Sequence, residues 1–479
     1  MRRNIFYNTM YQIVNMMIPL ILAPYLSRIL GASGVGVNSY AKAIAGYFVL
    51  FAMQGLNQYG NRTIALSKES KEEVSKSFWE VYIVQAMTSI IVLIAYLFFI
   101  ELYSGEYKVA LKINIIYVIS AAFDINWFYF GIGEFKLSAI RNIGVKCITT
   151  ILIFAFVKSY TDIYIYIFIL STGILCSNLV LWLYLKKYII RVKVSVKECS
   201  KHIKPNFVLF IAVLAISMYK LMDKVMLGSM SNVIQNGYYE NMSNVITIPL
   251  SIITAVGTVM LPRVSQLVKD GEKEKVIQSN RDTIQVMLGL SIPFTVGICF
   301  IADSFVPLYF GQEFSECINV LKLLAITSPF ITFGNVIRTQ CVIPLKKDTI
   351  FVKATMIGAI LNFGVNLILI PPFGAVGAAI GTIVAEIAVA MYQYYKIRYV
   401  IYEIPIVEDN YVFVVSSIIM AIILWCISQL SLNQNLIMFL QMIIGCFVYI
   451  GCIYIYFRHC KNDRAQYWRK KLGRASNDI

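Results

Sequence analysis

Charged residues are scarce in this sequence, and its cysteines follow no recognisable spacing. Only 14% of the 479 residues are charged and 58% are hydrophobic, whereas a soluble chain has about 25% charged residues. The 10 cysteines are scattered, mostly within apolar runs, and indicate neither a metal site nor a disulfide framework. A chain with this composition must bury apolar surface in lipid as well as in a protein core.

Long apolar runs fill most of the chain. A membrane-spanning helix needs about 20 mainly apolar residues, so the sequence predicts an all-α polytopic membrane protein with about fourteen spans. The predicted spans are residues 6–29, 36–57, 79–103, 110–131, 137–157, 162–185, 206–229, 236–261, 284–310, 317–341, 349–371, 375–398, 410–430 and 435–457.

The connections between spans alternate between basic and nearly uncharged. With the N-terminus inside, the basic segments all lie on one side, and the opposite loops hold only Lys108 and Lys158. The positive-inside rule therefore predicts that both termini are cytoplasmic. This bias also accounts for the net charge of +16, so we expect no nucleic-acid partner.

Three landmarks recur in the same order in the two halves of the chain. The pairs are Arg28–Gly31 with Lys224–Gly228, Leu102–Gly105 with Leu308–Gly311, and the basic hairpins Glu134–Arg141 with Pro344–Lys353. Such a parallel repeat predicts two six-helix lobes with a substrate path between them. The predicted domains are an N-terminal lobe 1–185, a basic cytoplasmic linker 186–205, a C-terminal lobe 206–398, spans 13 and 14 within 399–457, and a basic cytoplasmic tail 458–479.

Several basic residues lie within spans, where a charge at the bilayer centre costs about 2.5–3.5 kcal/mol. They are Lys42, Lys146, Lys220 and Lys224, with Arg28 and Arg338 nearer the span ends. Such residues usually face a polar cavity or an ionised partner. Because Lys220 and Lys224 are four residues apart, they share one helix face. For Lys220 the alternative is a salt bridge with Asp223, which would only tie helices together.

Four acidic residues also lie within spans: Asp124, Asp223, Glu240 and Glu386. A carboxyl group in apolar surroundings can carry a proton or bind sodium, because desolvation favours its neutral form. We therefore expect Glu386, Asp223 or Asp124 to couple transport to an ion. For Glu386 the alternative is a hydrogen-bonded helix contact.

Short motifs resemble the polysaccharide or O-unit flippases, the Wzx-type members of the multidrug/oligosaccharidyl-lipid/polysaccharide exporter superfamily. In the first half these motifs are Pro24–Gly31 with Gly34–Gly36, Gln58–Arg62, Asn126–Phe128 with Glu134–Phe135, and Arg141–Asn142. In the second half they are Asp223–Lys224, Gly237–Glu240 and Leu261–Arg263. The resemblance covers residues 1 to about 400 and gives no motif for spans 13 and 14.

The resemblance implies two six-helix lobes around a central cavity. It also implies alternating-access export of undecaprenyl-diphosphate-linked oligosaccharide repeat units across a bacterial plasma membrane. The lysines and arginines named above would then bind the diphosphate. We expect no resident cofactor, metal or catalytic residue. The resemblance also implies that transport is coupled to a H⁺ or Na⁺ gradient. Expected partners are the lipid-linked oligosaccharide, membrane lipids and other polysaccharide assembly proteins.

Two other functions remain open at this stage. A multidrug exporter of the same superfamily is the first alternative, although its usually cationic cargo would be repelled by buried lysines. A membrane polysaccharide polymerase or ligase is the second. Such an enzyme would need acids, histidines or an outer domain, and both histidines, His202 and His459, fall on the predicted cytoplasmic side.

Overall fold

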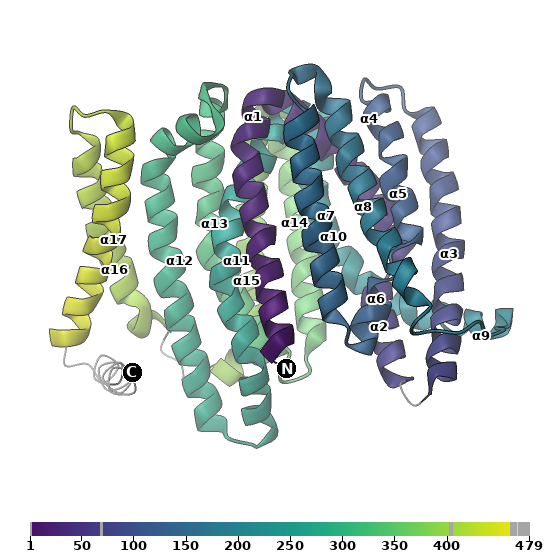
Figure 1. Ribbon diagram of the computed structural model, residues 1–479. Helices are drawn as coiled ribbons and strands as arrows, with labels where there is room; N and C mark the ends of the chain where they lie inside the picture. Colours follow the sequence, from purple (N-terminus) through teal and green to yellow (C-terminus); the bar gives the residue numbers. More distant parts are fainter. Residues whose placement is uncertain (1, 68–69, 402–405, 460–466, 468–479) are drawn as a thin grey trace. The chain divides into compact units, whose positions relative to one another are not determined.

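Helices make up nearly all of the described chain, as the apolar runs predict (Figure 1). The computed structural model describes residues 2–67, 70–401, 406–459 and 467, and these contain no β-strand. Of the predicted tail 458–479, only Arg458, His459 and Tyr467 belong to the described residues. The all-α polytopic membrane fold is therefore confirmed.

The chain divides into two compact units, Met1–Glu240 and Asn241–Ile479. The first unit contains α1 (Arg2–Met53), α2 (Leu56–Leu66), α3 (Lys71–Leu102), α4 (Lys108–Ile113), α5 (Ile115–Ala122), α6 (Asn126–Ile132), α7 (Phe135–Phe156), η1 (Tyr160–Asp162), α8 (Ile163–Leu185), α9 (Val196–Ser200), α10 (Ile203–Met230) and the start of α11 (Val233–Lys269). The second unit continues with α12 (Lys273–Phe310), η2 (Gln312–Cys317), α13 (Ile318–Ile337), η3 (Arg338–Val342), α14 (Asp348–Phe373), α15 (Ala375–Ile401), α16 (Ile406–Ser428) and α17 (Gln434–His459).

The first unit extends past the predicted N-terminal lobe. It includes the linker 186–205 and α10, because α10 packs against α1 and α2. The sequence predicts this helix at the start of the C-terminal lobe. The predicted lobe boundaries, and the central cavity between lobes, remain predictions.

Every predicted span corresponds to a helix or a set of helices. Among the described residues, 12 helical stretches are long and apolar enough to cross a membrane. The first, Met16–Leu66, covers the predicted span 36–57 and the part of the predicted span 6–29 from Met16 onward. The predicted span 206–229 is α10, which is not among the 12 and some of whose side chains lie outside the described residues.

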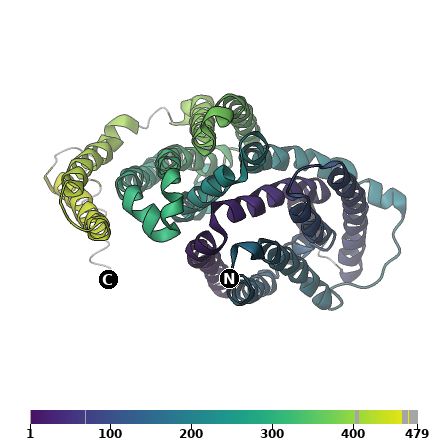
Figure 2. The ribbon, with the colours of Figure 1, turned by 90° about the horizontal axis from the view of Figure 1, so that it is seen from above.

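The first two predicted spans form one kinked helix instead of two helices joined by a loop. Within α1, Gly31 has φ 65° and ψ −178°, a conformation that glycine adopts without steric cost. Figure 2 shows the two halves of α1 running in different directions on either side of this kink. A single residue thus replaces the loop that we predicted.

The predicted span 110–131 is broken into α4, α5 and α6. Neighbouring side chains bind the carbonyl groups that the second break exposes. Gln85 Nε2 donates to the carbonyl oxygens of Ala121 at 2.8 Å and Asp124 at 2.9 Å, and Trp182 Nε1 donates to that of Phe123 at 3.0 Å. A broken helix is tolerated at membrane depth when protein groups satisfy its backbone in this way. Hydropathy alone does not reveal such a break.

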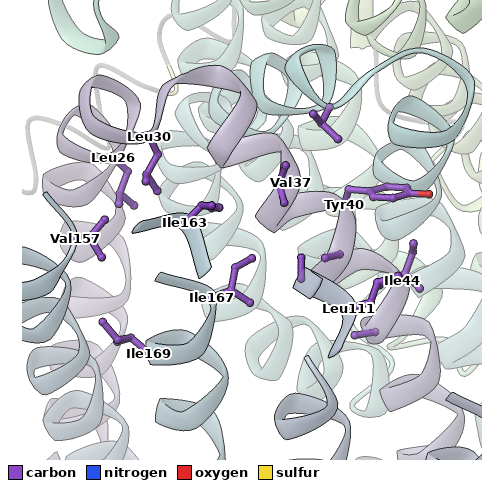
Figure 3. Close-up of a cluster of buried hydrophobic side chains, with 14 of the residues drawn as sticks. Leu26, Leu30, Val37, Tyr40, Ile44, Leu111, Val157, Ile163, Ile167 and Ile169 are labelled. Carbon is purple, nitrogen blue, oxygen red and sulfur yellow. The ribbon is translucent and has the colours of Figure 1, made fainter. Parts of the chain in front are cut away.

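A cluster of buried aliphatic side chains holds the two halves of α1 against neighbouring helices of the first unit. Leu26 and Leu30 come from before the kink, and Val37 and Ile44 from after it (Figure 3). Further members are Leu111, Val157, Ile163, Ile167 and Ile169. Because both halves of α1 pack into one core, the kink angle is fixed by packing as well as by Gly31.

In the second unit, α13 and α14 pack against α15, while α16 and α17 pack against α12. The Tyr449 hydroxyl of α17 donates to the carbonyl oxygen of Gly289 in α12 at 2.5 Å. Spans 13 and 14, for which we found no motif, are therefore attached to the second unit through α12.

Candidate functional site

The second half of α1 crosses the beginning of α11 at a pair of glycines. A Cβ atom on Gly36 would clash with the carbonyl oxygen of Val233, and one on Gly237 would clash with that of Ala32. Small residues allow membrane helices to approach this closely. The crossing therefore determines which side chains of the next helical turn face each other.

One turn beyond the two glycines, Ser39 of α1 meets Glu240 of α11. Ser39 Oγ donates a hydrogen bond to Glu240 Oε2 at 2.9 Å. The Lys224 ammonium of α10 lies 2.5 Å from the same carboxylate oxygen. The side chains of Lys224 and Glu240 are 26% and 23% exposed, so this ion pair is accessible from outside the protein core.

Two further lysines lie near this pair. Lys42 follows Ser39 by three residues, which places both on one face of α1, and its side chain is exposed. Its charge interacts with Glu240 and Lys224, and also with Lys146 of α7. Lys42, Lys146, Lys224 and Glu240 are termed the lysine cluster below. The structure thus brings three of the predicted phosphate-binding residues together, while their binding role remains a prediction.

A second contact between α10 and α11 lies beside the ion pair. Asp223 is buried, and its Oδ2 accepts a hydrogen bond from the Tyr239 hydroxyl at 2.6 Å. Consecutive residues of α10 thus contact consecutive residues of α11. Lys220 lies one turn earlier on α10, but its side chain is outside the described part of the structure. Its predicted role and its alternative pairing with Asp223 therefore stay predictions.

Three other predicted site residues lie elsewhere in the fold. Arg28 is exposed and precedes the kink in α1. Arg338 belongs to the second unit, where it begins the π-helical turn η3 and its guanidinium carbon lies 5.0 Å from the centre of the Phe351 ring. Glu386 of α15 is half-buried, also in the second unit. The predicted roles of Arg28, Arg338 and Glu386 in binding or coupling remain predictions.

Asp124, a predicted coupling residue, caps the start of α6. Its Oδ1 accepts hydrogen bonds from the backbone N–H of Asn126 at 3.0 Å and from Asn126 Nδ2 at 2.6 Å. Asn126 in turn accepts from Arg141 at 2.9 Å, and Arg141 donates to the carbonyl oxygen of Ser177 at 3.0 Å. This network gives Asp124 a structural role at the helix break, and it includes the motif residues Asn126 and Arg141.

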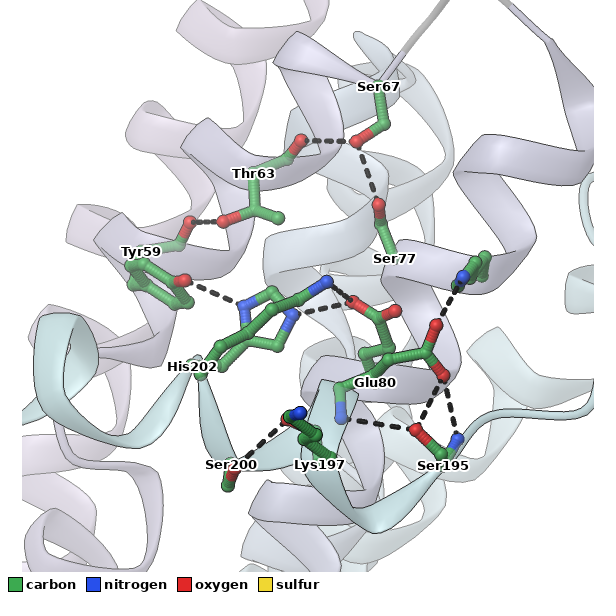
Figure 4. Close-up of polar contacts among 12 residues, drawn as sticks. Tyr59, Thr63, Ser67, Ser77, Glu80, Ser195, Lys197, Ser200 and His202 are labelled. Carbon is green, nitrogen blue, oxygen red and sulfur yellow. Dashed lines mark hydrogen bonds and ion pairs between the residues drawn. The ribbon is translucent and has the colours of Figure 1, made fainter.

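Sequence reasoning missed a second cluster of ionisable side chains in the first unit (Figure 4). His202 lies between Tyr59 and Glu80: its Nδ1 is 2.6 Å from the Tyr59 hydroxyl, and its Nε2 is 2.7 Å from Glu80 Oε2. Lys201 Nζ lies 3.1 Å from the same oxygen. These four residues are termed the His202 cluster. They join α2, α3 and the start of α10, which are distant in sequence, so no local pattern could have indicated them.

The second unit contains a hollow of about 380 Å³ between α11 and α12. Arg263, from one of the motifs, lines it together with Lys275 and Asp282. The Tyr467 hydroxyl closes one side by donating to Asp282 Oδ2 at 2.7 Å. The hollow combines both signs of charge, so it has no clear preference for anions.

The lysine cluster, by contrast, contains three ammonium groups and one carboxylate. An ammonium is a compact charge with three donors, which suits the oxygens of a phosphate. Among the described residues, no group of three or more His, Cys, Asp or Glu side chains is arranged to hold a metal ion. The chemistry that this arrangement supports best is reversible binding of an anion.

Comparison with known proteins gives a consistent set of relatives. The "Putative O-antigen transporter" of Escherichia coli K12 is 24% identical over 399 residues, covering 81% of this chain and 94% of its own length. The solved structure "Lipid II flippase MurJ, inward closed conformation" matches with a TM-score of 0.78 at 17% identity, covering 96% of this chain and 99% of that one. An inward-facing multidrug resistance MATE family transporter matches with a TM-score of 0.52 at 14% identity, over 82% and 98% of the two chains.

The two structural likenesses show the fold, and MurJ shares more of it than the multidrug transporter. The family described as "Polysaccharide biosynthesis protein" matches residues 1–268, which is more than half of the sequence and includes every residue of the lysine cluster. The chain belongs to the polysaccharide biosynthesis protein family.

Proposed function

We propose that this protein is a flippase that moves lipid-linked oligosaccharide repeat units across the plasma membrane, for the synthesis of a surface polysaccharide. In this proposal the lysine cluster binds the diphosphate that links lipid and sugar. The observation that carries the proposal is the excess of ammonium groups over carboxylates at this accessible site in a family of polysaccharide biosynthesis proteins.

The sign of this charge also separates the proposal from its main alternative. A cationic drug would be repelled by Lys42, Lys146 and Lys224, whereas a diphosphate would be attracted. The name of the E. coli relative, an O-antigen transporter, is consistent with a saccharide cargo. Multidrug efflux is supported only by a distant likeness of fold.

The membrane potential favours the loaded step. A diphosphate with about two negative charges moves outward along an inside-negative potential, which contributes roughly 4.6 kcal/mol at about 100 mV. Coupling to H⁺ or Na⁺ would then serve to reset the empty protein. Glu386 and Asp223 are the coupling candidates that have no helix-capping role in the structure.

The orientation of the protein is part of the proposal. Both termini are placed in the cytoplasm, because the basic connections then lie on the inner side. A reporter fused after Ile479 that is active only outside the cell would contradict this orientation.

The proposed function is tested by complementation of a flippase-deficient strain, with lipid-linked repeat units assayed on each leaflet. Lys42→Gln and Lys224→Gln should abolish export at matched membrane expression, and the Lys→Arg variants should retain part of it. Lys112→Gln, which changes an exposed lysine of α4, is the matched control. Full export by both cluster variants would refute a diphosphate site at the lysine cluster.

A further inference from the structure

The lysine cluster already contains an anion of its own. Glu240 Oε2 accepts a hydrogen bond from Ser39 and pairs with the Lys224 ammonium at 2.5 Å, while the charge of Lys42 also interacts with Glu240. The carboxylate therefore occupies donors that an incoming phosphate would need. Of the acids within the predicted spans, sequence reasoning had not put Glu240 forward as a functional residue.

The position of Glu240 is fixed independently of the lysines. The close approach of α1 and α11 at Gly36 and Gly237 places Glu240 opposite Ser39. Lys224 reaches the carboxylate from a third helix, α10. Because the hydrogen bond from Ser39 does not involve Lys224, it can hold the carboxylate in place while Lys224 changes partner.

From this arrangement we propose that Glu240 is an internal counter-ion that the diphosphate of the cargo displaces from Lys224. The inference rests on the proposed function. It assigns to Glu240 the control of the balance between binding of the diphosphate and its release. Carboxylate and phosphate oxygens accept charge-assisted hydrogen bonds from the same ammonium donors. They therefore compete for Lys224.

Such a counter-ion serves both states of the site. In the empty protein, it prevents several ammonium groups from lying together without a partner, which is costly at membrane depth. In the loaded protein, Lys224 and Lys42 contact the diphosphate. When the cargo leaves, Glu240 pairs with Lys224 again. A flippase needs this second role because cargo that binds too tightly is not released.

The proposal makes a prediction that differs from that of a purely structural ion pair. Removing the charge of Glu240 frees Lys224, so it should tighten binding of a diphosphate and slow its release. A salt bridge that only holds α10 against α11 would have the opposite effect, because its loss would disorder the lysine and weaken binding.

The test uses the purified full-length protein with geranyl diphosphate as a soluble probe, together with export in the complementation strain. Glu240→Gln should lower the Kd for the probe by about tenfold or more, as expected for loss of a competing charge-assisted hydrogen bond, and should reduce export. Glu240→Asp, whose shorter side chain withdraws the carboxylate from Lys224, should shift the Kd in the same direction. The aspartate variant provides the same test if the glutamine variant does not fold.

The matched control is Asp303→Asn, which removes the carboxylate from another lysine pair, with Lys322 at 2.8 Å in the second unit. It should leave both Kd and export unchanged. Weaker or unchanged probe binding by both Glu240 variants would overturn the counter-ion role. If Lys42→Gln and Lys224→Gln also bind the probe as the wild type does, the diphosphate site itself is wrong, and the counter-ion role falls with it.

Discussion

Two clusters of ionisable side chains in the first unit differ in how completely they are buried and paired. In the His202 cluster, the side chains of Glu80 and His202 are 3% and 8% exposed. In the lysine cluster, Lys224 and Glu240 are each about a quarter exposed, and Lys42 is exposed. The Glu80–His202 contact is therefore closed to solvent, with Lys201 at its edge 56% exposed, whereas the lysine cluster is open to a ligand.

This difference indicates different roles for the two clusters. A buried carboxylate needs a partner, because an isolated charge in a core is very costly. Glu80 Oε2 pairs with both His202 and Lys201, and these contacts join α3 to the start of α10. An accessible group of three lysines with one carboxylate is not arranged for stability. Positions of this kind are usually retained for function, at some cost in stability. The predictions below test this distinction through stability measurements.

The largest effect is expected for Glu80→Ala. This change removes the carboxylate that pairs with both His202 Nε2 and Lys201 Nζ, and breaking a buried ion pair typically costs about 3–5 kcal/mol. The matched control is Glu101→Ala on the same helix, where the carboxylate is 74% exposed and 3.7 Å from Lys108. We expect a large fall in the thermal midpoint in detergent for Glu80→Ala and almost none for the control. Equal midpoints would show that the His202 cluster does not stabilise the fold.

A smaller effect on stability, but a complete loss of export, is expected for Gly36→Ala. The added methyl group clashes with the Val233 carbonyl, so α1 and α11 must separate, and overpacking of this kind costs about 1–3 kcal/mol. Separation also moves Ser39 away from Glu240. Gly144→Ala is the control, because nothing lies near its added methyl group in α7. Normal export by Gly36→Ala would show that the glycine crossing does not position the lysine cluster.

Close to no effect on stability is expected for Lys42→Gln, even though export should be lost. The substitution removes one of several like charges from an accessible site, and substitutions at such positions usually change stability by less than about 0.5 kcal/mol. The thermal midpoint should match that of Lys112→Gln, the exposed control on α4. A large loss of stability would assign the lysine cluster a structural role and remove its distinction from the His202 cluster.

The parts of this protein that sequence alone predicts are those set by local composition. The apolar runs predict the helices, and the cost of charge at membrane depth singles out Lys42, Lys146 and Lys224. The contact of Ser39 with Glu240 was not predictable, because it depends on a helix crossing between Gly36 and Gly237, which are far apart in sequence. His202 and Glu80 were missed for the same reason, since their contact joins residues 122 positions apart. The predicted break between residues 29 and 36 contains Gly31, but hydropathy does not distinguish a kink at one residue from a loop.

A small and salt-dependent effect is expected for Glu198→Gln, at a partly exposed ion pair near the His202 cluster. Lys76 Nζ lies 2.5 Å from Glu198 Oε1, and this ammonium, with the N–H and hydroxyl of Ser195, lowers the pKa of Glu198 from 4.5 to about 2. Because the pKa is lower in the folded protein, the stabilisation is present above pH 4.5 and is lost as the pH falls toward 2. Exposed pairs contribute little and are screened by salt, so the small difference in thermal midpoint from wild type should be seen at pH 7 in low salt. It should vanish in 1 M salt and shrink below pH 4.5. If Glu198→Gln lowered the thermal midpoint as much as Glu80→Ala does, and independently of salt, burial would not distinguish the Lys76–Glu198 pair from the Glu80–His202 pair.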